Sequence, residues 1–204
     1  QFMSIASTNE FGSPDLDLRP PEMFRSTINM WIQRCTGCGL CAPDLSELEI
    51  PTRAAKEIIG QSDYQHQLNN ADFPELSNSF LCASLIEEET KNYDFAARLC
   101  MFAAWICDDV EMKAASVYSR QKALRMLDTA RLAGQKFEDE PATEKGIEID
   151  LLRRSGQFER ALTACEEALS QYSENGTHEI FTFQKSLIQR KDDGCYTLDD
   201  VDNV

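Results

Sequence analysis

The sequence of 204 residues has little histidine and little glycine. Its two histidines, at positions 66 and 178, are far apart and isolated, so no His-based catalytic triad can be placed. Its nine glycines form neither the Gly-x-x-x-x-Gly-Lys loop that holds phosphates nor the Gly-x-Ser-x-Gly turn that presents a nucleophilic serine. These absences argue against the common nucleotide-binding and hydrolase signatures and favour a protein that is not an enzyme.

Long apolar runs are also missing. The most apolar run, Leu99 to Cys107, has about half of the roughly 20 residues that a membrane-spanning helix needs. No signal-peptide pattern opens the sequence. Since the first residues are Gln1-Phe2-Met3, we expect the natural protein to begin further upstream.

Positive charge is scarce. Lys and Arg number 20 against 35 Asp and Glu, which gives a formal net charge of −15. This balance opposes binding to nucleic acid, whose affinity comes largely from cations on phosphates, and it opposes docking on anionic membranes. It indicates a solvated acidic surface, or else a basic or peptide partner. The carboxylate pairs Asp108-Asp109 and Asp192-Asp193 are predicted to be solvated surface charges, not acid–base catalysts.

Cysteine, by contrast, is plentiful, with eight residues. Cys82, Cys100, Cys107 and Cys165 lie within apolar helical patterns, where free cysteine behaves as a small buried hydrophobe. This placement, with no secretory signal, predicts a reducing, cytoplasmic environment.

Turn and helix signals divide the sequence into an irregular module, 1–50, and an α-helical domain, 51–204. The module is predicted to hold short strands at 2–6 and 27–33, the second being rich in β-branched and aromatic residues. The acidic tail from Asp192 is expected to fray. Apolar periodicity and end signals predict helices at 52–60, 62–69, 74–91, 93–109, 111–135, 142–154, 158–172 and 178–191.

Two helical pairs resemble tetratricopeptide repeats, which need small residues where their helices approach closely. The pattern is degenerate, since Lys145 and Glu148 stand where the repeat has apolar residues and one overlong helix separates the two matches. We therefore predict a mainly α fold, a tetratricopeptide-like right-handed stack of antiparallel helical pairs with a small N-terminal β/loop module resembling a zinc ribbon. A generic helical bundle is the alternative. The residues at repeat positions are Phe80, Ser84, Tyr93, Ala96 and Ala103 in one pair, and Gly156, Phe158, Ala161, Cys165, Ala168 and Leu169 in the other.

Such stacks present a concave face to a peptide or to another protein, which predicts a protein partner here. The face cannot be assigned from the sequence. Trp105, Met101 and Met126 are predicted to be core residues instead of ligand contacts.

Three cysteines cluster in Arg34-Cys35-Thr36-Gly37-Cys38-Gly39-Leu40-Cys41. A strand followed by Cys-x-x-Cys-Gly is typical of a zinc knuckle, in which the glycine lets the backbone aim two thiolates at one ion. Cys35, Cys38 and Cys41 are therefore the predicted metal ligands, with Zn²⁺ as the predicted ion. A structural zinc needs four ligands, and the isolated His66 and His178 are predicted to lie elsewhere.

Three alternatives stay open for this cluster. The spacing of Cys35, Cys38 and Cys41 also matches the first three positions of a ferredoxin-type iron–sulfur run, but Leu45 stands where the fourth cysteine belongs. Cys82 or Cys195 would have to complete such a site from a distance. A thiol–disulfide pair normally lies at a helix N-terminus, which the strand–turn flanks argue against. The cluster can also be a relic that binds nothing.

Several stretches resemble an uncharacterised bacterial family. They are Ser7-Thr8-Asn9-x-Phe11-Gly12-Ser13-Pro14-Asp15-Leu16-Asp17-x-Arg19-Pro20, Trp31-x-Gln33-Arg34-Cys35-x-x-Cys38-Gly39, Ala103-Ala104-Trp105 and Leu151-Leu152-Arg153-Arg154-Ser155-Gly156-Gln157-Phe158. The resemblance implies a zinc-ribbon-like N-terminus before tetratricopeptide-like helices. It also implies a second Cys-x-x-Cys upstream of Gln1 that would supply the missing ligands.

These observations favour a non-enzymatic interaction or scaffold protein with a structural zinc knuckle. The alternative is a cytoplasmic iron–sulfur or thiol redox protein that uses Cys35, Cys38 and Cys41. An enzyme with a cleft between the two modules is a third hypothesis, for which no residue can be nominated.

Overall fold

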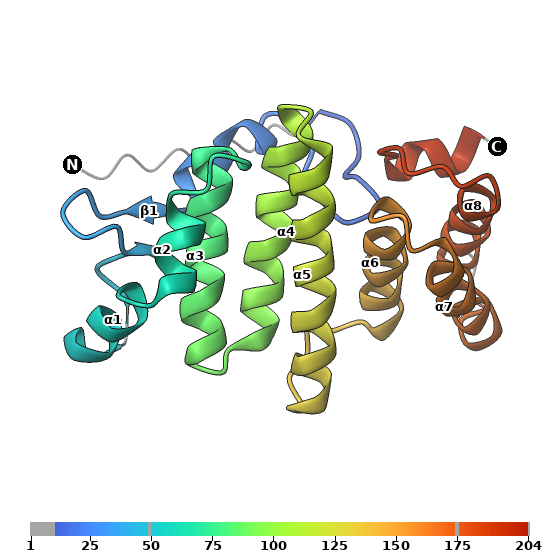
Figure 1. The fold of residues 1–204 in the computed structure, drawn as a ribbon. Helices are drawn as coiled ribbons and strands as arrows, with labels where there is room; N and C mark the ends of the chain where they lie inside the picture. Colours follow the sequence, from blue (N-terminus) through green and yellow to red (C-terminus); the bar gives the residue numbers. More distant parts are fainter. Residues whose placement is uncertain (1–10, 49, 174–175, 204) are drawn as a thin grey trace.

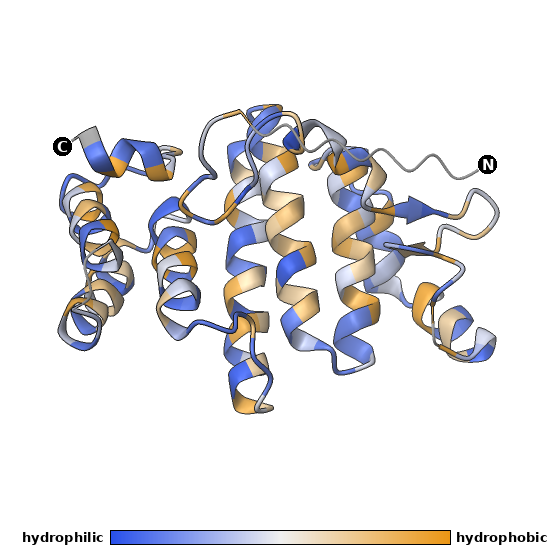
Figure 2. Ribbon diagram, turned by 180° about the vertical axis from the view of Figure 1, so that it is seen from behind, coloured by the Kyte–Doolittle hydropathy of each residue, from blue (hydrophilic) through white to orange (hydrophobic). Residues whose placement is uncertain are grey.

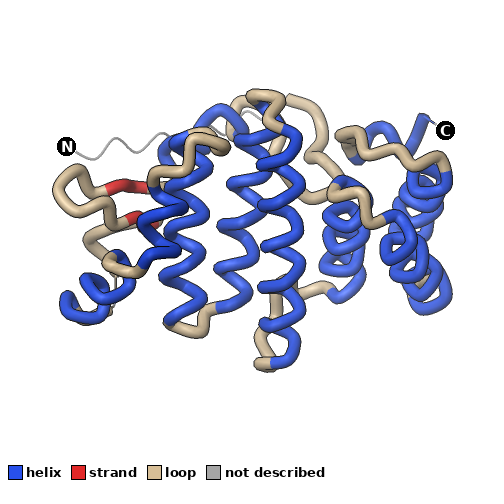
Figure 3. Tube along the Cα trace, viewed as in Figure 1, coloured by secondary structure: helices blue, strands red, loops and turns tan. Residues whose placement is uncertain are grey.

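The computed structural model describes residues 11–48, 50–173 and 176–203, and most of them lie in helices that follow one another along the chain (Figures 1 and 3). A short antiparallel sheet and two 3-10 helices, η1 and η2, complete the architecture. The elements in order are η1 (Arg25–Met30), β1 (Gln33–Arg34), β2 (Cys41–Ala42), α1 (Thr52–Ile59), α2 (Ser62–Leu68), α3 (Glu75–Glu89), α4 (Tyr93–Asp109), α5 (Lys113–Leu132), α6 (Pro141–Arg154), α7 (Phe158–Gln171), α8 (Thr177–Gln189) and η2 (Leu198–Asn203).

From α3 to α8 each helix packs against the next one, and α6 also contacts α8. Helix α4 is the centre, because it packs most extensively on α3 and α5. Its contact faces carry small side chains that are fully buried, such as Ala96, Cys100 and Ala103, and small residues let helices approach closely. Seen from behind in Figure 2, the central helices alternate between hydrophobic and hydrophilic residues along their length. The predicted mainly α stack with a small β element is confirmed, whereas the assignment to tetratricopeptide repeats stays a prediction.

The predicted helices are found with shifts of a few residues at their ends, and the overlong one is the continuous helix α5. The four helical cysteines are all buried, as predicted. In the part of the chain that the structure describes, no helix is both long enough and apolar enough to cross a membrane.

The ends of α3, α4, α5, α6 and α8 share one geometry. The residue just beyond the last turn has a positive φ, and the next backbone N–H bonds back to a carbonyl at the end of the helix. This Schellman geometry satisfies carbonyls that the helix leaves unpaired and turns the chain sharply back. The donors are Asn92, Met112, Gln135, Gln157 and Asp192.

The predicted strand at 27–33 is wrong over most of its length. Residues 25–30 form η1 instead, and only its last residue, Gln33, lies in a strand. The turn of helix buries Ile28 in the main core, and Ile32, two residues beyond its end, is buried there as well. The turn also lets Trp31 Nε1 donate to Thr27 Oγ1 at 2.9 Å. This burial outweighs the β propensity of branched residues, which depends strongly on context. The strand predicted at 2–6 lies outside the described residues.

The N-terminal strap, which we define as residues 11–24, runs irregularly along one end of the helices, at the top of Figure 1. It reaches the C-terminal segment, where Leu16 N donates to Tyr196 O and Leu198 N donates to Pro14 O, both at 2.9 Å. A second small core forms there around Leu16, Phe183 and Leu187. The prediction that the tail frays from Asp192 is therefore wrong, because its backbone pairs with the strap and its apolar side chains are covered.

Candidate functional site

Cys35 and Cys38 lie at the tip of the hairpin between β1 and β2, and Cys41 begins β2. Gln33 pairs with Ala42 and Arg34 with Cys41. Inside the turn Cys35 N donates to Leu40 O at 2.8 Å, and Gly39 N donates to Cys35 O at 2.9 Å. Gly39 has a φ of +76°, which L side chains rarely adopt. The turn is therefore tight, as the glycine of Cys-x-x-Cys-Gly permits, while the zinc knuckle itself stays a prediction.

Cys35 and Cys38 lie together on the outer side of this turn. The backbone N–H groups of Cys38 and Gly37 point at Cys35 and lower the pKa of its thiol, and the two thiols also hydrogen-bond. Cys38 is exposed and Cys35 is half-buried. The pair has the donor type and the accessibility of half a four-thiolate metal site.

Cys41 belongs to a different, interior group. It is fully buried, and its backbone N–H donates to the hydroxyl of buried Tyr64 at 3.0 Å. A hydrogen bond from the Cys82 thiol, opposed by burial, lowers the pKa of Cys41 to about 7. The same hydrogen bond and burial raise the pKa of Cys82. The structure thus places Cys41 with Cys82 and Tyr64, behind the knuckle instead of at its tip.

The remaining candidate ligands are dispersed. His66 and His178 are both exposed, on α2 and α8. The thiol of Cys195 donates to Asp15 Oδ2 at 3.2 Å, beside the strap. Within residues 11–48, 50–173 and 176–203, no group of three or more His, Cys, Asp or Glu side chains is placed to hold a metal ion. The ligand set Cys35, Cys38 and Cys41 stays a prediction, for which this geometry offers the first two.

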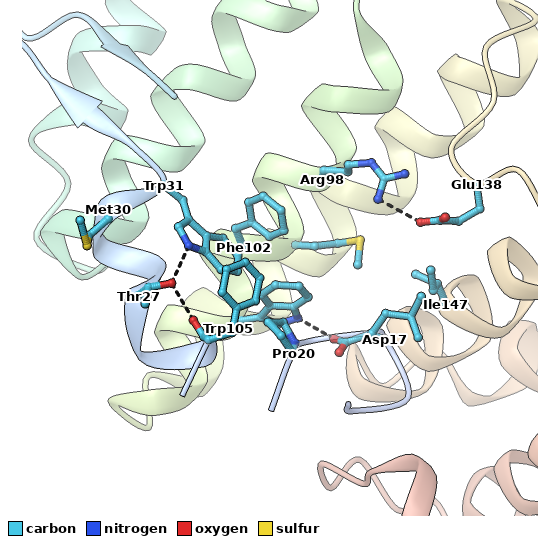
Figure 4. A pocket seen from close by; sticks show the side chains of 13 residues that line it. Asp17, Pro20, Thr27, Met30, Trp31, Arg98, Phe102, Trp105, Glu138 and Ile147 are labelled. Carbon is cyan, nitrogen blue, oxygen red and sulfur yellow. Dashed lines mark hydrogen bonds and ion pairs between the residues drawn. The ribbon is translucent and has the colours of Figure 1, made fainter. Parts of the chain in front are cut away.

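A second candidate site is an apolar pocket with a volume of about 670 Å³. The strap and η1 form one wall, helix α4 forms the floor, and α6 and the loop before it close the far side (Figure 4). The volume lies within the range of roughly 300–1,000 Å³ that is usual for ligand sites. The lining residues are Asp17, Leu18, Pro20, Phe24, Thr27, Met30, Trp31, Arg98, Met101, Phe102, Trp105, Glu138 and Ile147.

Aromatic rings dominate this pocket. The Trp31 and Phe102 rings meet edge to face with centroids 5.3 Å apart, and the Phe102 and Trp105 centroids are 5.0 Å apart. Phe24 adds a further ring 4.9 Å from Trp31. Trp105 and Met101 are buried as predicted, at 3% exposure each. Because both side chains also line the pocket, burial does not exclude them from binding.

The polar groups in the lining are engaged within the chain. Asp17 Oδ2 accepts a hydrogen bond from Trp105 Nε1 at 2.8 Å. Arg98 Nη1 pairs with Glu138 Oε1 at 2.9 Å, and its Nη2 donates to the Phe137 carbonyl. The Thr27 hydroxyl likewise donates to the Phe24 carbonyl and accepts from Trp31 Nε1. The surface offered to a ligand is therefore apolar in character.

Behind the pocket lies what we call the ion-pair box, formed by Asp17, Asp108, Arg120 and Arg154. Arg120 and Arg154 lie 2.6 and 2.8 Å from Asp108 Oδ2, and 3.8 and 3.5 Å from Asp17 Oδ2. The four residues come from the strap, α4, α5 and α6, so the box ties the strap to three helices. Asp17, which is 0% exposed, also holds the pocket ring of Trp105.

The prediction that Asp108 is a solvated surface charge is wrong. Its side chain is 23% exposed and bonded to both arginines and to the Ser116 hydroxyl. Burial alone raises the pKa of Asp108, but the hydrogen bond and charge of Arg120, with help from Arg154, bring it below its ordinary value. The position of Asp108 at the end of a helix does not reveal these ion pairs in the sequence, because Arg120 and Arg154 are 12 and 46 residues away.

The sequence missed the pocket and the ion-pair box because both depend on contacts between distant segments. Asp17 and Trp105 are 88 positions apart. The local signal is the alternation of charged and apolar residues in the strap from Asp15 to Arg19, of which all but Leu18 are buried.

Comparison of the chain with protein-family models, with curated protein sequences and with solved structures gave no match.

Proposed function

We propose that this protein is a non-enzymatic, cytoplasmic interaction protein that binds another protein through its helical stack. The observation that carries this proposal is the aromatic pocket between the strap and α4, which opens onto exposed apolar side chains. Apolar surface rimmed by polar residues marks interaction sites on proteins, and aromatic residues supply most of the affinity in such sites. The tetratricopeptide-like character of the stack, the division at residue 50, and the lack of nucleic-acid or membrane binding belong to this proposal.

The proposal includes a structural zinc ion at the knuckle. Cys35 and Cys38 fit as two thiolate ligands, and the family resemblance implies a second Cys-x-x-Cys upstream of Gln1 for the other two. The ion would stabilise the hairpin that continues directly from Trp31, a wall of the pocket. Expression with the native upstream residues, followed by metal analysis and a visible spectrum, tests this part. We expect about one zinc per chain and no colour, whereas iron with a broad visible band would favour the iron–sulfur alternative.

Site-specific photo-cross-linking tests the interaction. A photoreactive residue is placed at Met30, on the pocket rim, and in a matched protein at Leu132, which is 91% exposed at the end of α5. We expect a partner protein to be cross-linked at position 30 and not at 132. The purified partner should then bind the wild type and not the Phe24→Ser/Met30→Ser variant. Equal products at both positions, or none, would contradict the proposal.

A further inference from the structure

We propose that the pocket receives a positively charged segment of the partner that presents large apolar side chains, as an amphipathic helix does. This inference rests on the proposed function and specifies its partner. Three properties of the site carry it, namely its lining, its extent and its charge.

The lining favours apolar side chains over a polar metabolite. Asp17, Thr27 and Arg98 all make hydrogen bonds or ion pairs within the chain. A polar ligand would have to compete with these bonds or leave its own polar groups unsatisfied, which is costly in a desolvated site. Apolar side chains need no such partner. Met30 and Met101 also line the pocket. Methionine side chains are unbranched and flexible, and they are common on surfaces that bind apolar side chains of varied shape.

The extent favours a polypeptide over a small molecule. Three lining residues, Leu18, Phe24 and Met30, also reach the surface, with 38%, 43% and 43% exposure. We call these three residues the apolar rim. Figure 4 shows Met30 at the outer side of the site, away from the inner ring of Trp105. Within the described residues, five of the eight exposed large hydrophobic side chains lie between positions 11 and 30. An apolar surface that continues beyond the pocket suits a partner that lies across it.

The charge favours a basic partner. The loop at one side of the pocket reads Glu138-Asp139-Glu140, of which Glu138 pairs with Arg98 while Asp139 and Glu140 are exposed. Asp139 shares a neighbouring cavity with the cations Arg131, Lys136 and Lys145, but the whole chain carries a net charge of −15. A positive partner would be attracted by this field, and a negative one would be repelled.

The test uses tryptophan fluorescence, because the chain has two tryptophans and both line the pocket. The probes are short tryptophan-free peptides with one helical pattern: leucine with lysine, leucine with glutamate, and alanine with lysine. We expect the leucine–lysine peptide to change the emission with a Kd on the order of 10 μM, and the other two to bind at least about tenfold more weakly. Binding should weaken as salt is raised.

Matched variants locate the binding. Phe24→Ser/Met30→Ser alters the exposed rim and should weaken the leucine–lysine peptide about tenfold, with an unchanged far-UV spectrum. Leu132→Ser removes an apolar side chain that is even more exposed, at 91%, and lies elsewhere on the chain, so it should have no effect. Met30→Ser alone serves if the double variant folds poorly.

The inference is overturned if the leucine–glutamate or alanine–lysine peptide binds as tightly, or if the rim variant binds like the wild type. It is also overturned if the neutral apolar dye N-phenyl-1-naphthylamine binds and none of the peptides displaces it. In each case the cross-linking experiment decides separately whether the protein has a partner at all.

Discussion

The strap and the cysteine turn are both irregular segments that lie before α1, yet they are held in opposite ways. The strap buries Asp15, Asp17 and Arg19 and pairs Asp17 with arginines from two helices. The turn presents Cys35 and Cys38 outward. Its backbone hydrogen bonds are local, and Gly39 and Cys41 behind these two thiols bond to the Tyr64 hydroxyl. The polar side chains of the strap are therefore paired within the chain. The two thiols of the turn are instead available as ligands for a bound ion. Irregular backbone alone does not distinguish a structural segment from a ligand site. Polar side chains that point inward indicate a structural segment, and polar side chains that point outward indicate a possible ligand site.

The largest effect should come from breaking the strap. Asp17→Ala removes the acceptor of Trp105 and one carboxylate of the ion-pair box. Loss of one member of a buried ionic group leaves uncompensated charge, so we expect stability to fall by about 4 kcal/mol. Urea unfolding at pH 7 followed by tryptophan emission measures it. Asp139→Ala, in the exposed loop, should change stability by less than about 0.5 kcal/mol. Similar values for the two variants would show that the box does not hold the strap.

Asp108→Asn tests the same box through its dependence on pH. We expect a loss of about 2–3 kcal/mol at pH 7, since both arginines lose a charged partner. The pKa of Asp108 is lower in the folded protein than the ordinary value of 3.8. The folded state therefore binds fewer protons, and this stabilisation is complete above the unfolded pKa and lost as the pH falls through the folded one.

Urea midpoints from pH 7 down to pH 2 should accordingly differ by a constant amount above about pH 4 and converge below it for the wild type and Asp108→Asn. The variant lacks this titration and should lose less stability on acidification. A constant difference at all pH values would mean that the charge of Asp108 is not what stabilises the box.

A smaller effect is expected in the cysteine turn. Gly39→Ala introduces a side chain at a φ of +76°, where its Cβ would lie 2.5 Å from Leu68 Cδ2. Left-handed backbone costs a non-glycine residue about 1–2 kcal/mol, and buried Leu68 must also shift. Thermal unfolding of the metal-free protein measures the change. Gly37→Ala is the matched control, because its Cβ would meet only Cys35 Sγ, at an ordinary 3.9 Å. Equal destabilisation by both substitutions would argue against this turn geometry.

The smallest effect on stability should come from the exposed thiols. Cys35→Ser and Cys38→Ser should change the stability of the metal-free protein by less than about 0.5 kcal/mol. Each should weaken zinc binding at least about tenfold, as measured by competition with a chromophoric chelator. Cys41→Ser should instead lower stability by about 1–2 kcal/mol, because it alters a buried hydrogen-bonded group, and should have little effect on zinc. A Cys41 variant that loses zinc while keeping its stability would restore Cys41 as a ligand.

The sequence by itself determined the helices and the tight cysteine turn. Apolar periodicity located α1 to α8, because each helix must bury one or more faces whatever its neighbours are. The spacing of Cys35, Cys38 and Gly39 predicted a tight turn with two adjacent thiols, since a turn of this size depends on local backbone geometry. The buried state of the helical cysteines followed from the same periodicity.

Only the tertiary structure decided the rest. Residues 27–30 became helical because Ile28 and Ile32 reach the core together, and Cys41 turned inward to Cys82, which is 41 positions further along the chain. The pocket exists because the strap crosses α4, and the strap stays there because Asp17 meets arginines from α5 and α6. Such contacts join residues that are distant in the sequence. Neither secondary-structure propensity nor the spacing of neighbouring residues encodes them.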